Sequence, residues 1–428
     1  MKKVLVISYY WPPAGGPGVQ RWLNFIKYLP SFGIQPIVYV PSNAHYPLQD
    51  PSLVAEVPEH IRVIRKKILE PYGLARIFSK HHTSRISSGI IPEAQTQNLV
   101  QKILLFIRGN LFIPDARKFW IKPSANYLTA LLQRESIDTI ITTGPPHSMH
   151  LIGMKLKEAT GVRWIADFRD PWTRISYHDK LKLLPGSRRK HESLEEKVLS
   201  TADLLLTTSF STAAEFRQKT QRPVEVITNG YDGPLARNTF SPKHFSLAHI
   251  GSLLSGRNPE NLWAALGELG EEVSGFRRDL RLELTGAIGD SVINSIRSSG
   301  LEANLEIRNY VSHEEALRLQ RKAALLLLIE INREETRGII PGKLFEYMAS
   351  GRPILGIGPE GADFRTILEE THTGTFFAYH EKEAIKSFLL KKYQEFQEGI
   401  LQSHPVGLEK YSRKSLTGRL SEVILKYE

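Results

Sequence analysis

The chain alternates short aliphatic runs with longer amphipathic stretches. In its first half, six segments have the composition of buried strands, at 3–8, 36–41, 137–146, 163–168, 202–209 and 224–230. The stretches between them, such as GVQRWLNFIKYLPSFG at 18–33, have the apolar spacing of helices. Strands that alternate with helices predict a mostly parallel sheet with helices on both faces.

The same rhythm starts again in the second half of the chain. Six further strand-like segments lie at 246–253, 280–286, 304–311, 323–330, 353–358 and 374–379. Between the two sets, GYDGPLARNTFSPKHF is rich in Gly, Pro and Asn, as linkers are. We therefore predict an α/β protein with two Rossmann-like, doubly wound domains facing a central cleft. The predicted boundaries are 1–230 for the first domain, 231–245 for the linker, 246–405 for the second domain, and 406–428 for a C-terminal helix that crosses back to the first domain.

Composition fits this architecture. With 428 residues, 41% of them hydrophobic and 24% charged, the chain is long enough for two globular domains. No apolar run approaches the ~20 residues that cross a bilayer. The first residues, MKKVLVISYYWPP, lack a small-residue cleavage site and are interpreted as a strand. The absence of cysteine fits a reducing compartment, so the expected location is the cytoplasm.

The net charge of +11 is concentrated in one segment. His60–Lys122 holds twelve Lys or Arg residues against three Asp or Glu, and it includes the apolar stretch LVQKILLFIRGNLFI. A basic, partly amphipathic region is typical of a surface that contacts anionic membranes at the inner face of the cell. A solvated helical face above core residues explains the pattern equally well. Nucleic acid is not expected, because no nucleic-acid-binding motif accompanies the charge.

Ligands of doubly wound folds bind at the carboxyl ends of the strands, where helices begin. Two candidate sites in the first domain meet this condition. After the first strand, Gly15 and Gly16 allow backbone amides to approach an anion, with Arg21 close behind, although a plain tight turn is the alternative. In WIADFRDPW, Asp170 and Arg169 follow a strand, and His147 follows a neighbouring one. Asp170 either acts as a base or hydroxyl acceptor, or only caps the next segment.

Two more candidates lie in the second domain. A strand ends at Gly251, and Arg257 follows in the loop before a helix. Further on, a helix that begins near Pro341 and Gly342 offers free amides and the positive end of its dipole to an anion. Lys343 adds charge, and Glu346 shares its helical face and suits a sugar hydroxyl. An ordinary surface Lys–Glu pair is the competing interpretation.

Five motifs, taken in order, resemble those of a known family. PPAGGPG, DFRDPW, ITNGYD, HIGSLLSGR and PGKLFEYMASGRPIL are similar to the motifs of retaining glycosyltransferases of the GT-B fold, in the large family numbered four. The resemblance covers nearly the whole chain. It implies transfer of a sugar from a nucleotide-sugar bound mainly in the second domain to an acceptor bound in the first. Together with the expected membrane contact, this indicates a glycan or lipid-linked acceptor in envelope polysaccharide or lipopolysaccharide synthesis. Neither a metal nor another cofactor is expected.

The resemblance also implies roles for particular residues. Arg257 falls on the cation that binds the donor diphosphate, and Glu346 falls on the carboxylate that binds ribose. The phosphates would be held by backbone amides in the run Ile340, Pro341, Gly342, Lys343 and Leu344. The Gly15–Gly16 loop would approach the same phosphates. Asp170 and Arg169 fall near the functional polar position of the first domain, while Arg21 and His147 are weaker candidates for the acceptor.

Two departures from the family pattern leave alternatives open. The acid expected eight residues before Glu346 is Gly338, and Glu334 or Glu335 is the possible substitute. The arginine expected directly after Gly251 is Ser252. A relative without catalytic activity that binds nucleotide or glycan, and a nucleotide-sugar epimerase on the same fold, are therefore the alternatives to a transferase.

Overall fold

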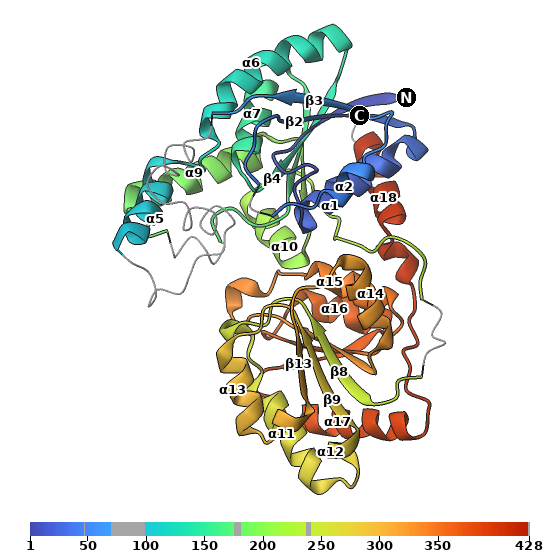
Figure 1. Cartoon of the computed structure of the whole chain (residues 1–428). Coiled ribbons are helices and arrows are strands. Elements are labelled where there is room, and N and C mark those ends of the chain that lie inside the picture. The colour runs from blue at the N-terminus through green and yellow to red at the C-terminus, as the bar shows by residue number, and fades with distance from the viewer. Residues whose placement is uncertain (47, 70–98, 175–180, 237–240, 427–428) are drawn as a thin grey trace. The chain divides into compact units, whose positions relative to one another are not determined.

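The computed structural model describes residues 1–46, 48–69, 99–174, 181–236 and 241–426 (Figure 1). The chain divides into two compact units. Unit 1 comprises Met1–Thr228 and Arg413–Glu428, and unit 2 comprises Asn229–Ser412. The described part of the predicted linker at 231–245 lies in unit 2, where the first strand already begins at Phe245.

Within the described residues, unit 1 is built on a seven-stranded parallel sheet with the order β3-β2-β1-β4-β5-β6-β7. The strands are β1 (Lys2–Ile7), β2 (Ile34–Pro41), β3 (Arg62–Lys66), β4 (Thr139–Gly144), β5 (Arg163–Phe168), β6 (Leu204–Thr207) and β7 (Val224–Val226). Six of them confirm the strands expected from the aliphatic runs. The prediction omitted β3, because this edge strand has the sequence RVIRK and buries little of it.

Helices lie on both faces of this sheet, with α6 and α7 on one side and α1 and α18 on the other (Figure 1). The helices of unit 1 are α1 (Pro17–Tyr28), α2 (Ser52–Ala55), α5 (Leu99–Leu111), α6 (Lys118–Glu135), α7 (Ser148–Thr160), α9 (Pro185–Thr201), α10 (Phe210–Lys219) and α18 (Arg413–Lys426), with the 3-10 turn η1 (Leu29–Phe32). Helix α18 is the predicted C-terminal helix. Its residues Leu416, Leu420 and Ile424 are buried in the core of unit 1.

Unit 2 has a six-stranded parallel sheet in its described residues, in the order β10-β9-β8-β11-β12-β13. The strands are β8 (Phe245–Ile250), β9 (Leu280–Thr285), β10 (Leu305–Arg308), β11 (Leu325–Ile329), β12 (Ile354–Gly358) and β13 (Gly374–Ala378). The helices and 3-10 turns are η3 (Ser255–Arg257), α11 (Glu260–Glu272), α12 (Phe276–Asp279), α13 (Asp290–Ser298), η4 (Glu302–Asn304), α14 (His313–Lys322), η5 (Glu334–Thr336), α15 (Gly342–Ala349), α16 (Asp363–Thr371), α17 (Lys382–Gln397) and η6 (Leu408–Tyr411).

Strand β11 shows why the predicted strands are continuous apolar runs. Leu325, Leu327 and Ile329 pack into the cluster beneath α11 and α17, whereas Leu326 and Leu328 pack into the cluster beneath α15 and α16. Successive side chains of a strand point to opposite faces, so a strand covered by helices on both sides is apolar at most positions.

Each sheet reverses its strand order once, and such reversals place ligand sites in doubly wound folds. In unit 1 the reversal lies between β1 and β4, and in unit 2 it lies between β8 and β11. The two neighbouring strands there carry their connections to opposite faces, which leaves the carboxyl ends accessible between the loops. Among the described residues, no helix is long and apolar enough to cross a membrane.

Candidate functional site

In unit 2, the reversal point begins with the turn after β8. Gly251 has φ +128°, a conformation that residues with side chains rarely adopt. A Cβ at Gly251 would lie 3.0 Å from the Nζ atom of Lys343, which reaches over this turn from the first turn of α15. Two sequence-predicted residues, Gly251 and Lys343, are therefore in direct contact at the carboxyl end of β8.

His249 supports Lys343 from within the sheet. Its ring is buried, Nδ1 lies 3.0 Å from the carbonyl oxygen of Leu327, and Nε2 lies 3.3 Å from Nζ of Lys343. If Nδ1–H donates to that carbonyl, Nε2 is left with a lone pair that accepts from Lys343. Burial, reinforced by the charge of Lys343, holds the pKa of His249 well below its ordinary value, so the ring is neutral.

Lys343 itself is affected by this environment. Desolvation, together with the nearby positive charge of Arg257, lowers the pKa of Lys343 to about 8, although Glu330 and Glu346 act in the opposite direction. A cation that loses its proton so readily gains more than most from a ligand that carries negative charge.

Arg257 is held at the same place by a carboxylate that sequence reasoning missed. Its Nε and Nη2 atoms donate to Oε1 of Glu330 at 3.0 and 2.6 Å. Glu330 directly follows β11, and its side chain is 4% exposed against 27% for Arg257. The amide of Ile331 also donates to Oε1. One carboxylate thus fixes the guanidinium at the reversal point.

Helix α15 completes the arrangement. It begins after Pro341 without a side-chain cap, so Gly342 and Lys343 lie in its first turn, where helix amides are free for an anion. Glu346 lies one turn further along, is half-buried, and accepts a hydrogen bond of 3.2 Å from Nε2 of Gln320. Ile340 and Leu344 are buried, so they contribute backbone and packing only.

The acid missing at Gly338 has no clear substitute. Glu334 and Glu335 are both exposed in η5, and Glu334 lies 3.5 Å from Arg337 in an exposed ion pair. Neither joins the cluster around Lys343 in the described contacts.

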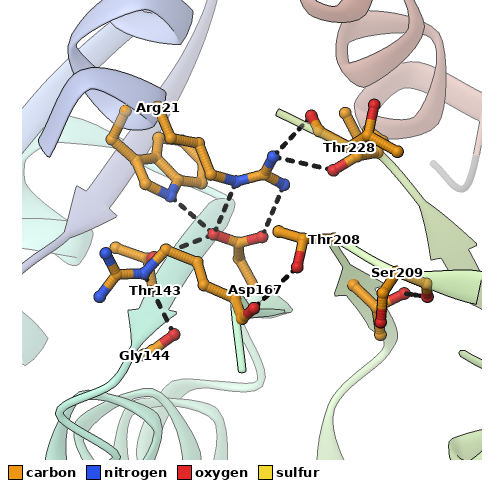
Figure 2. Close-up of polar contacts among 11 residues, drawn as sticks. Arg21, Thr143, Gly144, Asp167, Thr208, Ser209 and Thr228 are labelled. Carbon is orange, nitrogen blue, oxygen red and sulfur yellow. Dashed lines mark hydrogen bonds and ion pairs between the residues drawn. The ribbon is translucent and has the colours of Figure 1, made fainter. Parts of the chain in front are cut away.

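In unit 1, the reversal point is organised around a buried carboxylate, Asp167 at the end of β5 (Figure 2). Arg21 Nη2 donates to it at 2.9 Å, Trp22 Nε1 at 2.7 Å, and the Thr143 hydroxyl at 2.9 Å. Burial alone would raise the pKa of Asp167, but the charge and hydrogen bonds of Arg21, with that of Trp22, outweigh burial and lower it. Asp167 is therefore an ionised structural residue.

This network corrects the prediction for Arg21. The side chain is 1% exposed, and its Nη1 atom donates to the carbonyl oxygens of Ile227 and Thr228 at 2.8 and 2.9 Å (Figure 2). Arg21 thus connects α1 to β5 and to the backbone at Ile227 and Thr228, and its side chain does not face an acceptor. His147 is also a correction, because it is buried and stacks on Trp172 at 4.7 Å.

The remaining predicted residues of unit 1 lie at the rim of the same reversal point. Gly15 donates its amide to Leu48, and Gly16 has φ +101° where it precedes α1. Arg169 directly follows β5 and is half-buried, whereas Asp170 is exposed. Whether these residues contact a substrate stays a prediction.

No protein-family model matches the sequence, and no curated protein sequence matches it significantly. Solved structures do resemble the chain. The lipopolysaccharide outer core galactosyltransferase WaaB, in its apo form, is 14% identical with a TM-score of 0.58, and the match covers 100% of both chains. HepE from Anabaena, in complex with UDP-glucose, is 11% identical with a TM-score of 0.58 and the same coverage. A putative UDP-N-acetylglucosamine 2-epimerase from Listeria monocytogenes is 11% identical with a TM-score of 0.53, covering 99% of this chain and 96% of that one.

At this level of identity the comparisons establish the fold alone. The chain has the GT-B fold, with two α/β units that each contain a parallel sheet, as the sequence predicted. Because a transferase and an epimerase both resemble it, the activity has to be argued from the residues of the site.

Proposed function

We propose that the chain is a retaining glycosyltransferase of the family-four type. In this proposal it moves a sugar from a nucleoside-diphosphate donor to a glycan or lipid-linked acceptor in envelope polysaccharide or lipopolysaccharide synthesis. The observation that carries the proposal is the convergence of Lys343 and Arg257 at the carboxyl end of β8, beside the uncapped start of α15. Two cations and free amides around one turn suit a diphosphate.

The donor would be bound as follows. Its diphosphate contacts the Lys343 ammonium, the Arg257 guanidinium and the amides at the start of α15. Its ribose hydroxyls donate to the Glu346 carboxylate, which Gln320 orients. The HepE structure contains UDP-glucose, and this supports a UDP-sugar as the first donor to test.

The same residues account for catalysis. When the glycosidic bond to phosphate breaks, negative charge grows on the leaving diphosphate, and Lys343 and Arg257 stabilise it electrostatically. Because Glu330 already fixes the guanidinium, little reorganisation is needed in the transition state. The acceptor oxygen then bonds to the anomeric carbon on the face from which the diphosphate leaves, and its proton passes to the leaving phosphate. Attack on that same face retains the configuration. Half-buried Arg169 and exposed Asp170 orient the acceptor, and no metal is needed.

A second candidate is a nucleotide-binding relative without transferase activity. It is favoured by Gly338, which has no side chain, and by the exposure of Glu334 and Glu335. An epimerase is the third possibility, and it would convert the donor without an acceptor.

Donor binding is tested first, by thermal shift with UDP-, GDP-, ADP- and TDP-sugars. A ligand at one hundred times its dissociation constant adds roughly 2.7 kcal/mol of stability, which is ample for detection. We expect one nucleotide class to stabilise the protein, and Lys343→Met and Arg257→Gln to abolish the shift. Lys322→Met, on an exposed position of α14, is the matched control and retains it.

Activity is tested next with the donor that binds, with and without EDTA. Sugar transferred to an acceptor extract with retained configuration, unaffected by EDTA, is the expected result. Donor binding without transfer to any acceptor favours the non-catalytic relative, and conversion of the donor sugar without acceptor favours the epimerase. Absence of all nucleotide binding would refute the proposed donor site itself.

We also propose contact with anionic membranes through the basic segment His60–Lys122. Residues 70–98 of this segment lie outside the described residues. In the described part, α5 and the start of α6 expose Ile103, Phe106, Leu111 and Phe119. Apolar side chains among cations suit an interface with acidic lipid. Sedimentation with acidic liposomes should show binding at low salt that is lost at high salt, and equal sedimentation at both would refute the contact.

A further inference from the structure

Arg169 lies directly against the start of helix α1. A Cβ built on Gly18 would overlap the Nη1 atom of Arg169 and lie only 2.8 Å from its Cζ. Real Cβ atoms essentially never come closer than 3.0 Å to such an atom. Gly18, the second residue of α1, therefore leaves the space that the guanidinium occupies, and any side chain at this position displaces Arg169.

Backbone groups hold Arg169 in this place. Its Nε donates to the carbonyl oxygen of Gly144 at 3.2 Å, and its Nη2 donates to that of Pro145. The main chain of Arg169 is fixed as well, because its amide donates to the carbonyl oxygen of Gly144 at 3.0 Å. Its own carbonyl accepts from Oγ1 of Thr208 at 2.7 Å, the bond drawn from Thr208 in Figure 2. The orientation of the guanidinium is thus set before any ligand arrives.

No ion pair with a residue that the structure describes neutralises the charge of this guanidinium. Among the described residues, no carboxylate lies within ion-pair distance of Arg169. The nearby Asp167 is already committed to Arg21 and Trp22, and Asp170 is exposed. Desolvation lowers the pKa of Arg169, and the charges of Asp170 and Asp167 only partly offset it. A desolvated cation whose hydrogen bonds to described residues all go to carbonyl oxygens is stabilised by a ligand that supplies an anion.

An aromatic surface borders the cation. Tyr10 is partly exposed, and its ring centroid lies 5.9 Å from Cζ of Arg169. Tyr9 packs edge-on against Tyr10 at 4.9 Å, and Tyr46 lies 6.1 Å away, so the ring is held firmly. Rigid tyrosine rings offer an apolar face with a polar edge, which suits the face of a sugar ring.

We propose that Arg169, seated on Gly18 and bordered by Tyr10, forms a subsite of unit 1 that selects a sugar carrying an anionic group. Arg169 is the specificity-determining cation, and the group it binds is a carboxylate or a phosphate on the acceptor. This inference rests on the proposed glycosyltransferase function, and it narrows the acceptor to acidic glycans. Arginine suits either anion because its donors match two oxygens at once.

The test compares three probes at constant ionic strength: glucuronate, glucose 6-phosphate and neutral glucose. Saturating UDP is present to occupy the cations of unit 2, and dissociation constants are obtained from ligand-observed NMR titrations. We expect the wild-type chain to bind at least one acidic probe about tenfold more tightly than glucose, as one added charge-assisted hydrogen bond provides. Preference for glucuronate identifies a carboxylate, and preference for glucose 6-phosphate identifies a phosphate.

Two glycine variants give a matched comparison. Gly18→Ala should abolish the preference, because the new methyl group displaces the guanidinium without removing its charge. Gly186→Ala is the control, since Gly186 also follows a proline at the start of a helix and has nothing within 4 Å of its Cβ position. Arg169→Gln should remove the preference for the acidic probes over glucose.

The inference is overturned if the wild-type chain shows no preference, or if Gly18→Ala retains it. The UDP titration in the same samples separates this result from failure of the proposed function. UDP binding without an anion preference refutes the subsite alone. An Arg169-dependent preference without UDP binding refutes the donor site and supports the subsite.

Discussion

The lowered pKa of Lys343 makes donor binding depend on pH. In the free protein this pKa is about 8, because desolvation and the charge of Arg257 disfavour the ammonium form. A bound diphosphate compensates that charge and should return the pKa towards the ordinary value of 10.5. The difference of about 2.5 units corresponds to ~3.4 kcal/mol, which is the most that this one proton can contribute to binding.

The sign follows from which state holds the proton more tightly. The complex has the higher pKa, so binding is strongest below pH 8 and weakens as the pH rises from 8 towards 10.5. With these values the dissociation constant of UDP should be about tenfold larger at pH 9 than at pH 7. At pH 8 the free protein holds about half a proton on Lys343, so binding should take up about half a proton.

Isothermal titration calorimetry tests both numbers. Titrations at pH 7, 8 and 9, each in two buffers of different ionisation enthalpy, give the dissociation constant and the proton uptake. Lys343→Arg is the matched control, because arginine keeps its proton throughout this range. Any titration of the nucleotide affects both proteins equally and is removed by comparing them. If the wild-type chain and Lys343→Arg show the same pH dependence, Lys343 does not contact the diphosphate as proposed.

Three further predictions concern neighbouring groups. Glu330→Gln removes a negative charge that raises the pKa of Lys343, so the midpoint of the same calorimetric profile should move below pH 8; an unchanged midpoint would contradict this coupling. Gln320→Leu removes the hydrogen bond that orients Glu346, so UDP should bind about tenfold more weakly, whereas 2′,3′-dideoxy-UDP should bind as before. His150 has a pKa lowered by burial from 6.5 to about 3, so the unfolded chain takes up a proton below pH 6.5 that the folded chain does not. Stability should therefore fall by up to ~1.4 kcal/mol per pH unit between pH 6.5 and 3, and His150→Gln, compared by urea denaturation, should reduce that slope by one proton.

The sequence was sufficient for the fold because both sheets bury both faces. Runs such as AALLLLI have no polar position, and in β11 they place Leu326 on one face and Leu327 on the other. The same criterion failed for β3, whose edge position tolerates Arg62 and Lys66. The apolar runs therefore predicted twelve of the strands in the described residues. The exposed edge strand β3 has no apolar run that could predict it.

The site could be predicted only where a residue follows a strand or opens a helix. Gly251, Arg257 and Lys343 meet this condition, Glu346 lies one turn further along α15, and the structure brings them to one reversal point. His249 lies inside an apolar run and looks like a core residue until β8 and β11 are known to be neighbours. The prediction for Arg21 was wrong in the opposite way. A cation early in a helix looks like a solvent-facing residue, but Arg21 is buried against Asp167. The positions of neighbouring strands, which no local pattern specifies, decide both cases.

The departure at Ser252 has a spatial explanation. The resemblance implies a cation directly after Gly251, and this chain has a serine there, yet the Nζ atom of Lys343 lies over Gly251 itself. In the proposed donor site, Lys343 of α15 would supply this charge. A methyl group at Gly251 would lie 3.0 Å from Nζ and would also oppose φ +128°, so Gly251→Ala should weaken UDP binding as Lys343→Met does, without removing any charge. Wild-type affinity in Gly251→Ala would mean that the cation acts from elsewhere, and that the loss of arginine at position 252 is not compensated.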